Sequence, residues 1–157
     1  MNCNYANLKY NQIRNFKSIK CDLETDFTHF GSFDLILNFG FLEAINEIDI
    51  VLNCCVKMSK NILLETLVCD STAPDKVLKV PVDTIASDHP INSGISTRPS
   101  PFYIEQFFDC SGYSLKRYFD NDLNTPHHVY DWEHKNNESL LDNEKRSLRR
   151  YWHFYRD

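Results

Sequence analysis

The sequence is poor in glycine and in basic charge and has no long apolar run, and each shortage argues against a class of protein. The formal net charge is −5, and the only basic cluster is the short stretch around Arg146, Arg149 and Arg150. Extended contact with a phosphate backbone is therefore not expected, and nucleic acid is unsupported as a partner. No apolar stretch approaches the roughly 18 residues that span a bilayer, so no membrane association is expected.

The six cysteines lack the CxxC spacing of zinc fingers, and only one pair is adjacent in sequence. On a helix, the side chains of Cys54 and Cys55 would point about 100° apart, which suits neither a disulfide nor shared chemistry. This cysteine usage is typical of reduced, mostly buried thiols. It predicts a cytoplasmic protein.

Apolar residues make up 42% of the 157-residue chain, enough for one core, and we predict a single domain over residues 1–157. Phe33–Gly40 is an almost unbroken apolar run, as expected for a strand buried on both faces of a parallel sheet. Phe41–Met58 has apolar residues at helical spacing, and Asn61–Val68 is a second apolar run. This order predicts a right-handed parallel crossover.

The segments before this unit predict a short helix and a short strand. Apolar residues fall at helical spacing over residues 5–16, and Ser18–Leu23 has the composition of a strand with Asp22 at its carboxyl end. After the crossover, residues 69–98 mix Pro, Asp, Ser and Gly without periodicity. They predict a long loop or lid.

The last part of the chain predicts one helix and two strands. Pro99–Pro101 has the residues of a helix start, and Gly112 is typical of a helix end. Tyr113–Phe119 and Leu148–Tyr155 are the two predicted strands.

Four segments, in this order, resemble the class I S-adenosylmethionine-dependent methyltransferases: IKCDLET, GSFDLILNFGFLEAIN, NILLETLV and STRPSPFYIEQFFDCSGY. The resemblance implies an α/β fold with a partial Rossmann-like sheet, in which parallel strands carry helices on the faces and an antiparallel strand pair closes the C-terminal side. It implies S-adenosylmethionine as cofactor. Asp22 would contact its adenine end, and Asn38, Phe39 and Gly40 would lie where the methionine moiety meets the methyl acceptor.

The family's first strand and glycine-rich turn have no match, because the only glycines are Gly31, Gly40, Gly94 and Gly112. The chain therefore resembles the C-terminal two-thirds of the family, with half of a cofactor site, and is expected to be incomplete or inactive alone. The implied topology also leaves the Phe33–Gly40 strand with an open edge, which a second chain could complete.

The candidate site residues also have plainer explanations. Asp22 is equally suited to cap a turn, and Asn38–Gly40 could be a tight turn that tolerates positive φ. In the long loop near Asp88, His89 could act as a base and Arg98 could clamp an anionic acceptor. The plainer alternative is a solvated loop whose arginine caps a helix.

Neither a metal nor a catalytic residue is predicted. The His127, His128, Asp131 and His134 cluster fits no zinc spacing, and methyl transfer depends more on positioning than on acid–base groups. Three functions stay open: a methyltransferase-like domain, a non-catalytic binding or regulatory partner of a complete methyltransferase, and an unrelated small α/β binding domain. The methyl acceptor is not predicted.

Overall fold

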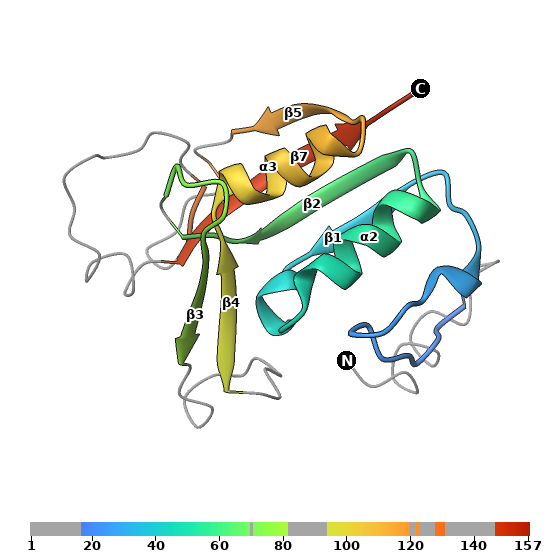
Figure 1. Cartoon of the computed structure of the whole chain (residues 1–157), viewed down its shortest axis with the longest axis horizontal. Helices are drawn as coiled ribbons and strands as arrows, with labels where there is room; N and C mark the ends of the chain where they lie inside the picture. Colours follow the sequence, from blue (N-terminus) through green and yellow to red (C-terminus); the bar gives the residue numbers. More distant parts are fainter. Residues whose placement is uncertain (1–16, 70, 82–93, 120–121, 123–127, 131–146) are drawn as a thin grey trace.

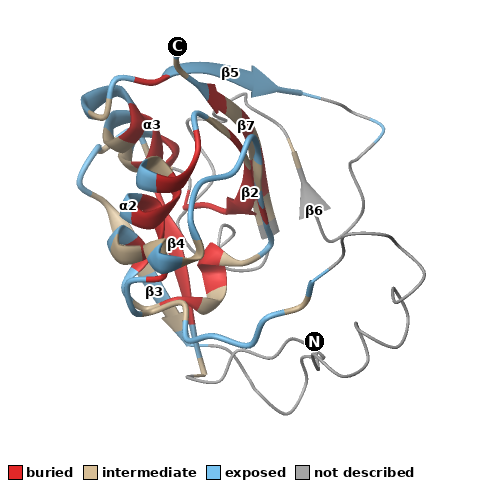
Figure 2. Ribbon diagram, turned by 90° about the vertical axis from the view of Figure 1, so that its right-hand side faces the viewer, coloured by how far each residue is buried: buried red, intermediate tan, exposed pale blue. Residues whose placement is uncertain are grey.

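A computed structural model describes residues 17–69, 71–81, 94–119, 122, 128–130 and 147–157. The main feature is a mixed sheet with the strand order β1-β2-β7-β5, to which the short strand β6 (His128–Val129) is added beside β7. A separate two-stranded ladder lies next to it, and the helices α2 and α3 lie on one side of the main sheet (Figure 1; Figure 2). The predicted α/β fold is confirmed.

The parallel part of the sheet is the strand–helix–strand unit expected from the sequence. β1 (Ile36–Phe39) pairs in parallel with β2 (Asn61–Leu67), and α2 (Ile48–Met58) connects them. The helix begins later than predicted. A 3-10 turn, η2 (Leu42–Ala44), comes first, and Ile45 then returns to an extended conformation. The carboxylate of Glu43 in this turn is held by β2 and β7, which fixes the segment in its non-α form.

The C-terminal strands form the predicted antiparallel pair. β7 (Ser147–Tyr155) lies between β2 and β5 (Ser114–Tyr118) and runs antiparallel to both. The last strand in the sequence is therefore a central strand of the sheet, flanked on both sides by strands that precede it in the chain.

Helix α3 (Pro101–Cys110) confirms the predicted helix start. Ser100 is the N-cap, with its side chain accepting a hydrogen bond from the Tyr103 N–H, and proline occupies the first turn. The helix ends at Ser111, and Gly112 follows with a φ of +77°, a conformation that favours glycine. Phe108 of this helix stacks on Phe154 of β7, with ring centroids 3.9 Å apart.

The long loop expected over residues 69–98 is partly wrong, because its two ends are strands. β3 (Val77–Pro81) and β4 (Ile95–Pro99) form an antiparallel ladder. The Cys69 N–H donates to the Pro99 carbonyl at 3.1 Å, so the ladder is joined to the end of β2. Neither segment alternates regularly between apolar and polar residues. They become strands because they pair with each other.

The strand predicted at Ser18–Leu23 is also wrong. The segment has no strand partner among the described residues; it leads into a turn followed by the short 3-10 helix η1 (Thr28–Phe30). Asp22 holds the turn, since its Oδ1 accepts from the Glu24 N–H and its carbonyl accepts from the Thr25 hydroxyl. Such local bonds compete with a sheet ladder. The helix predicted over residues 5–16 lies outside the described residues.

The two faces of the main sheet differ in burial (Figure 2). On the face toward α2 and α3, Ile62, Leu64 and Phe154 are fully buried. On the opposite face, Leu37 is 60% and Phe39 45% exposed. The expectation that this first strand is buried on both faces is therefore wrong, because both described α-helices lie on one side. Within the described residues, no helix is long and apolar enough to cross a membrane.

Candidate functional site

The carboxyl end of β1 is the place where the resemblance puts a cofactor. Asn38 and Phe39 are the last residues of the strand, and Gly40 turns the chain with a φ of +60°. The Gly40 N–H donates to the Glu65 carbonyl at 2.9 Å, which ties the turn to β2. The sequence therefore brings the predicted residues together as a defined turn at one edge of the sheet.

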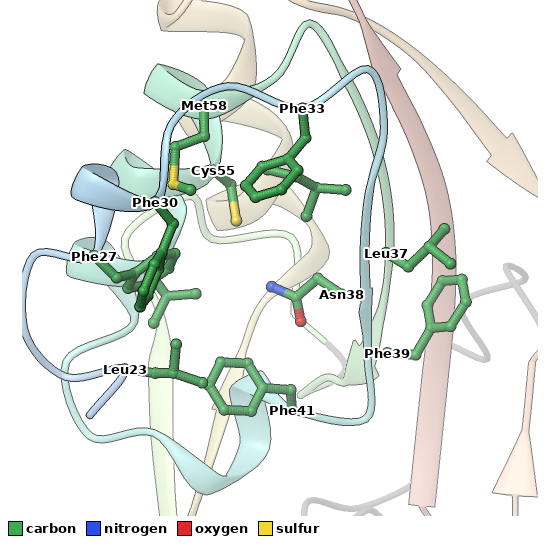
Figure 3. Close-up of a pocket in the computed structure, with 12 residues that line it drawn as sticks. Leu23, Phe27, Phe30, Phe33, Leu37, Asn38, Phe39, Phe41, Cys55 and Met58 are labelled. Atoms are coloured by element: carbon green, nitrogen blue, oxygen red, sulfur yellow. The ribbon is translucent and has the colours of Figure 1, made fainter. Parts of the chain in front are cut away.

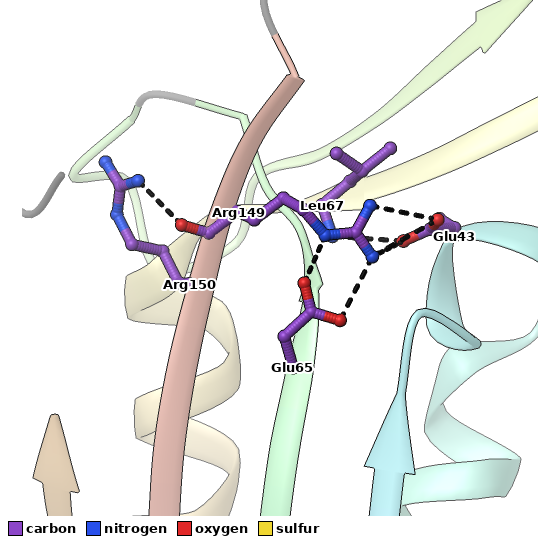
Figure 4. Close-up of polar contacts among 5 residues, drawn as sticks. All are labelled: Glu43, Glu65, Leu67, Arg149 and Arg150. Carbon is purple, nitrogen blue, oxygen red and sulfur yellow. Dashed lines mark hydrogen bonds and ion pairs between the residues drawn. The ribbon is translucent and has the colours of Figure 1, made fainter. Parts of the chain in front are cut away.

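A buried ionic group, the Arg149 cluster, lies beside this turn and consists of Arg149, Glu43 and Glu65 (Figure 4). Arg149 Nη2 lies 3.2 Å from Glu43 Oε2 and 3.0 Å from Glu65 Oε2, and its Nε donates to Glu65 Oε1. Glu43 Oε2 also accepts from the Leu67 N–H at 3.2 Å. One side chain of β7 thus connects β2 to the turn η2 that follows β1.

The Arg149 cluster is electrostatically strong because all three residues are less than 10% exposed. Burial acts to lower the pKa of Arg149, but the hydrogen bond to Glu65 and the charges of Glu43 and Glu65 together raise it. Nearby, burial and the charge of Glu65 raise the pKa of Tyr130. A Cβ at Gly40 would lie 3.2 Å from Arg149 Nη2, so the cluster also limits what can occupy the turn.

An apolar cavity of about 330 Å³, the β1 pocket, lies between β1, α2 and the segment that precedes β1 (Figure 3). It runs along the whole strand rather than only at its carboxyl end. Its lining residues are Leu23, Phe27, Phe30, Phe33, Ile36, Leu37, Asn38, Phe39, Phe41, Val51, Cys55 and Met58.

Asn38 is the one amide among the residues that line the β1 pocket (Figure 3). The residue is 5% exposed, and its Oδ1 accepts no hydrogen bond from the described part of the chain. Burial raises the pKa of Cys55 to about 12, although a hydrogen bond from Asn38 opposes the shift. Cys55 is therefore an unreactive thiol, and the Asn38 oxygen is left as an acceptor facing an apolar space.

The other predicted site residues are more scattered. Asp22 is exposed and caps its own turn, which is the plainer of its two explanations. Arg98 is buried within β4 at 9% exposure. Its ladder lies near the segment before α2, since Lys79 Nζ donates to the Asn46 carbonyl at 2.6 Å. His89 and its neighbour Asp88 lie outside the described residues.

The histidine-rich segment falls mostly outside the part of the chain that the structure describes. His128 belongs to β6, whereas His127, Asp131 and His134 are not described. Among the described residues, no group of three or more metal-ligating side chains occurs.

Sequence reasoning missed the Arg149 cluster. In the sequence Arg149 is part of the one short basic stretch, and its partners lie 84 and 106 residues away. One signal was present, because Glu65 interrupts the apolar run of a strand predicted to be buried. A buried carboxylate needs a cationic partner, which could have directed attention to an arginine on a neighbouring strand.

Two crystal structures of the N-terminal domain of EvdMO1 resemble this chain. The domain with SAH (S-adenosylhomocysteine) bound matches with a TM-score of 0.61 and 21% identity, over 74% of this chain and 53% of that chain. The domain in the presence of SAH and D-fucose matches with a TM-score of 0.67 and 17% identity, over 99% and 61%. No model of a known protein family and no curated protein matches the sequence.

These two matches bear on the fold. At 17% and 21% identity the likeness shows a shared architecture with an SAH-binding domain. The chain spans between half and two thirds of the length of the domains it matches, namely 53% and 61%.

Proposed function

We propose that the chain is part of an S-adenosylmethionine-dependent methyltransferase domain. Support comes from one observation above the others: the sheet with two parallel strands and β7 inserted antiparallel beside them matches a domain that has been crystallised with SAH bound. Bound S-adenosylmethionine would supply a methyl group on a sulfonium sulfur that is already a good leaving group, so the residues of this chain would need mainly to hold and orient it.

The proposed cofactor position is the carboxyl end of β1. Ligands of open parallel sheets bind at this end of the strands, where Asn38, Phe39 and Gly40 lie together. The buried Oδ1 of Asn38 offers an acceptor for a cofactor N–H, and Phe39 offers an apolar surface. The Arg149 cluster would act by holding the turn, as it anchors η2 and would crowd a Cβ at position 40, where Arg149 Nη2 would lie 3.2 Å away.

The chain is proposed to supply only part of the site. A glycine-rich turn lets a backbone approach the cofactor closely, and the four glycines of this sequence are too far apart to form one. Asp22 at the adenine end, and His89 with Arg98 at the acceptor, belong to the same proposal. A further segment or a second chain would complete the cofactor site.

Nuclear magnetic resonance with isotope-labelled chain tests this function. Added SAH should shift the amide resonances of Phe39 and Gly40, with a dissociation constant of about 1 mM for an incomplete site. Asn38→Ala should weaken binding at least about threefold. The control Asn53→Ala changes an exposed residue of α2 and should have no effect. If SAH leaves the Asn38–Gly40 resonances unchanged, the proposed cofactor position is wrong.

A second candidate is a non-catalytic partner of a complete methyltransferase. The observation in its favour is the exposed edge of β1, which offers a surface for another chain and requires no cofactor. Adding SAH distinguishes the two candidates, because a purely structural partner would bind its target equally well with and without SAH.

A further inference from the structure

The Arg149 cluster contains two carboxylates and one guanidinium, so its formal charge is −1. Among the described residues, Arg149 is the only cation that contacts Glu43 or Glu65. The next residue of β7, Arg150, extends away from the cluster and donates to the Arg149 carbonyl at 2.9 Å (Figure 4). The part of the chain that the structure describes therefore leaves one negative charge of the cluster without a balancing contact.

The surplus charge of the cluster is buried, and its effect is visible on nearby tyrosines. The three side chains are each 9% exposed or less, and a buried charge is screened much less than a surface charge. Burial and the charge of Glu65 raise the pKa of Tyr130 and of Tyr151. At Tyr130 the charge of Arg149 opposes the rise and the charge of Glu43 adds to it. The cluster thus disfavours a further negative charge beside it.

The Gly40 turn borders this cluster and is open to solvent. Gly40 is exposed, and a Cβ placed on it would lie 3.2 Å from Arg149 Nη2 and 3.8 Å from Glu65 Oε2. The guanidinium is the nearer group, but all three of its nitrogens donate to Glu43 or Glu65. Its charge is therefore offset by Glu65, and the charge of Glu43 remains. A ligand group at the turn would experience a net negative field.

The hydrogen-bonding groups of the turn have the same polarity. The Gly40 N–H is already used, since it donates to the Glu65 carbonyl at 2.9 Å. Asn38 is 5% exposed, and its Oδ1 accepts no hydrogen bond from the described part of the chain. The turn therefore offers a ligand an acceptor, whereas the Gly40 N–H and the Arg149 guanidinium are occupied. An anionic ligand group is disfavoured on both grounds.

We infer that the Arg149 cluster makes the Gly40 turn selective for a positively charged ligand group. In the proposed site this group is the sulfonium of S-adenosylmethionine, whereas the thioether sulfur of SAH is neutral, so the inference rests on the proposed function. Glu43 and Glu65 would determine this specificity from within the fold, through their charge. The product would consequently bind more weakly than the methyl donor, which favours replacement of one by the other.

The plainer explanation of the cluster is that it only holds η2 against β2 and β7. That role needs no surplus charge, because one carboxylate would balance the guanidinium. Glu43→Gln separates the two explanations. It removes the surplus charge, keeps the pair of Arg149 with Glu65, and retains a side-chain oxygen that can accept from the Leu67 N–H.

The first test needs no cofactor. Two nitroxide radicals of similar size, one carrying an amine and one a carboxylate, are added to isotope-labelled chain. Nuclear magnetic resonance then measures the paramagnetic relaxation of the Gly40 amide. Gly112, an exposed glycine before β5, serves as reference for the overall charge of −5. Relative to Gly112, the cationic probe should relax Gly40 at least about threefold more than the anionic probe.

Two variants show whether the cluster causes this difference. Glu43→Gln should reduce the ratio at Gly40 at least about twofold. Glu47→Gln removes the same charge at an exposed position and should leave the ratio unchanged. Equal relaxation of Gly40 by the two probes in the unchanged chain overturns the inference, even if Glu43→Gln does not fold. An equal loss in both variants overturns it as well.

Titration with the two cofactor forms gives the second test. S-adenosylmethionine should bind at least about fivefold more tightly than SAH, the size expected of one uncompensated charge. Glu43→Gln should bring the two dissociation constants within about twofold of each other, whereas Glu47→Gln should preserve the preference. The shifts of the Phe39 and Gly40 amide resonances measure the binding of each form.

The outcomes separate this inference from the proposed function. If SAH binds at the turn and S-adenosylmethionine binds no more tightly, the inference is overturned and the function stands. If neither form binds but the cationic probe is still favoured at Gly40, the proposed function is refuted. The selectivity of the turn for positive charge then remains.

Discussion

The two faces of the main sheet are made by alternate residues of the same strands, yet they are buried to different extents. Trp152 and Phe154 of β7 are fully buried beneath the helices, whereas Tyr155 is 42% exposed on the opposite face of the sheet, the open face, which also carries Leu37, Phe39, Tyr118 and Tyr151. The side chains on the two faces are similar in apolar character. The difference shows that burial in this domain depends on which elements cover a face, and it makes the open face the part of the molecule that needs explanation.

Replacing a large aromatic residue on each face tests this contrast with the largest expected effect. Trp152→Ala should lower the free energy of unfolding by about 3–5 kcal/mol, because it removes a fully buried ring. It also removes the hydrogen bond that Nε1 donates to Glu105 at 2.9 Å. Tyr151→Ala should cost only about 1 kcal/mol. Urea unfolding measures both, and equal losses would show that the open face is packed in solution.

The Arg149 cluster is the exception on the open face, since its three residues are less than 10% exposed. Arg149→Met should cost about 3 kcal/mol, since it leaves the carboxylates of Glu43 and Glu65 buried without their cation. Combining it with Glu43→Gln and Glu65→Gln should recover more than half of the lost free energy of unfolding. Urea unfolding of the single and the triple variant measures both values. A triple variant no more stable than the single one would show that repulsion between the carboxylates is not the cause.

Helix α3 covers the buried face, and its cap should contribute a smaller amount. Ser100 is fully buried, accepts from the Tyr103 N–H at 3.0 Å and donates to the Ala73 carbonyl at 2.6 Å. Ser100→Ala should therefore cost about 1–2 kcal/mol. Ser114→Ala, at an exposed position of β5, should change stability by less than about 0.5 kcal/mol. Thermal unfolding distinguishes the two.

The smallest effect on stability is expected at the open edge. Leu37→Ser should change the free energy of unfolding by less than about 0.5 kcal/mol, because the side chain is 60% exposed. It should also raise the highest concentration at which the chain is still monomeric, since a polar residue interrupts the apolar strand edge. Light scattering over a dilution series measures this. A loss of stability comparable to that of a core substitution would place Leu37 inside a packed surface.

The regular elements could be predicted where one local signal was sufficient. The apolar run of β2, the imperfect alternation of β7 and the Ser100–Pro101 start of α3 identified their elements, because burial and capping depend on neighbours in sequence. The antiparallel C-terminal strand pair followed from the resemblance. The predicted turn at Asn38–Gly40 is present, although its role stays a prediction.

The remaining features depend on contacts between distant residues. Val77–Pro81 and Ile95–Pro99 become strands through pairing with each other. Asp22 ends no strand, because the segment before it has no partner among the described residues. The Arg149 cluster joins three segments whose proximity exists only in the folded sheet. No local pattern of residues contains this information.

The central position of β7 has a consequence for synthesis of the protein. β2 and β5 contact each other only through β7, so neither can complete its hydrogen bonds until residues 147–155 have left the ribosome. Until then, the nascent chain exposes Ile62 and Leu64, which are fully buried in the finished sheet. Chaperone binding should accordingly persist until the final strand inserts, and this step should limit the rate of folding.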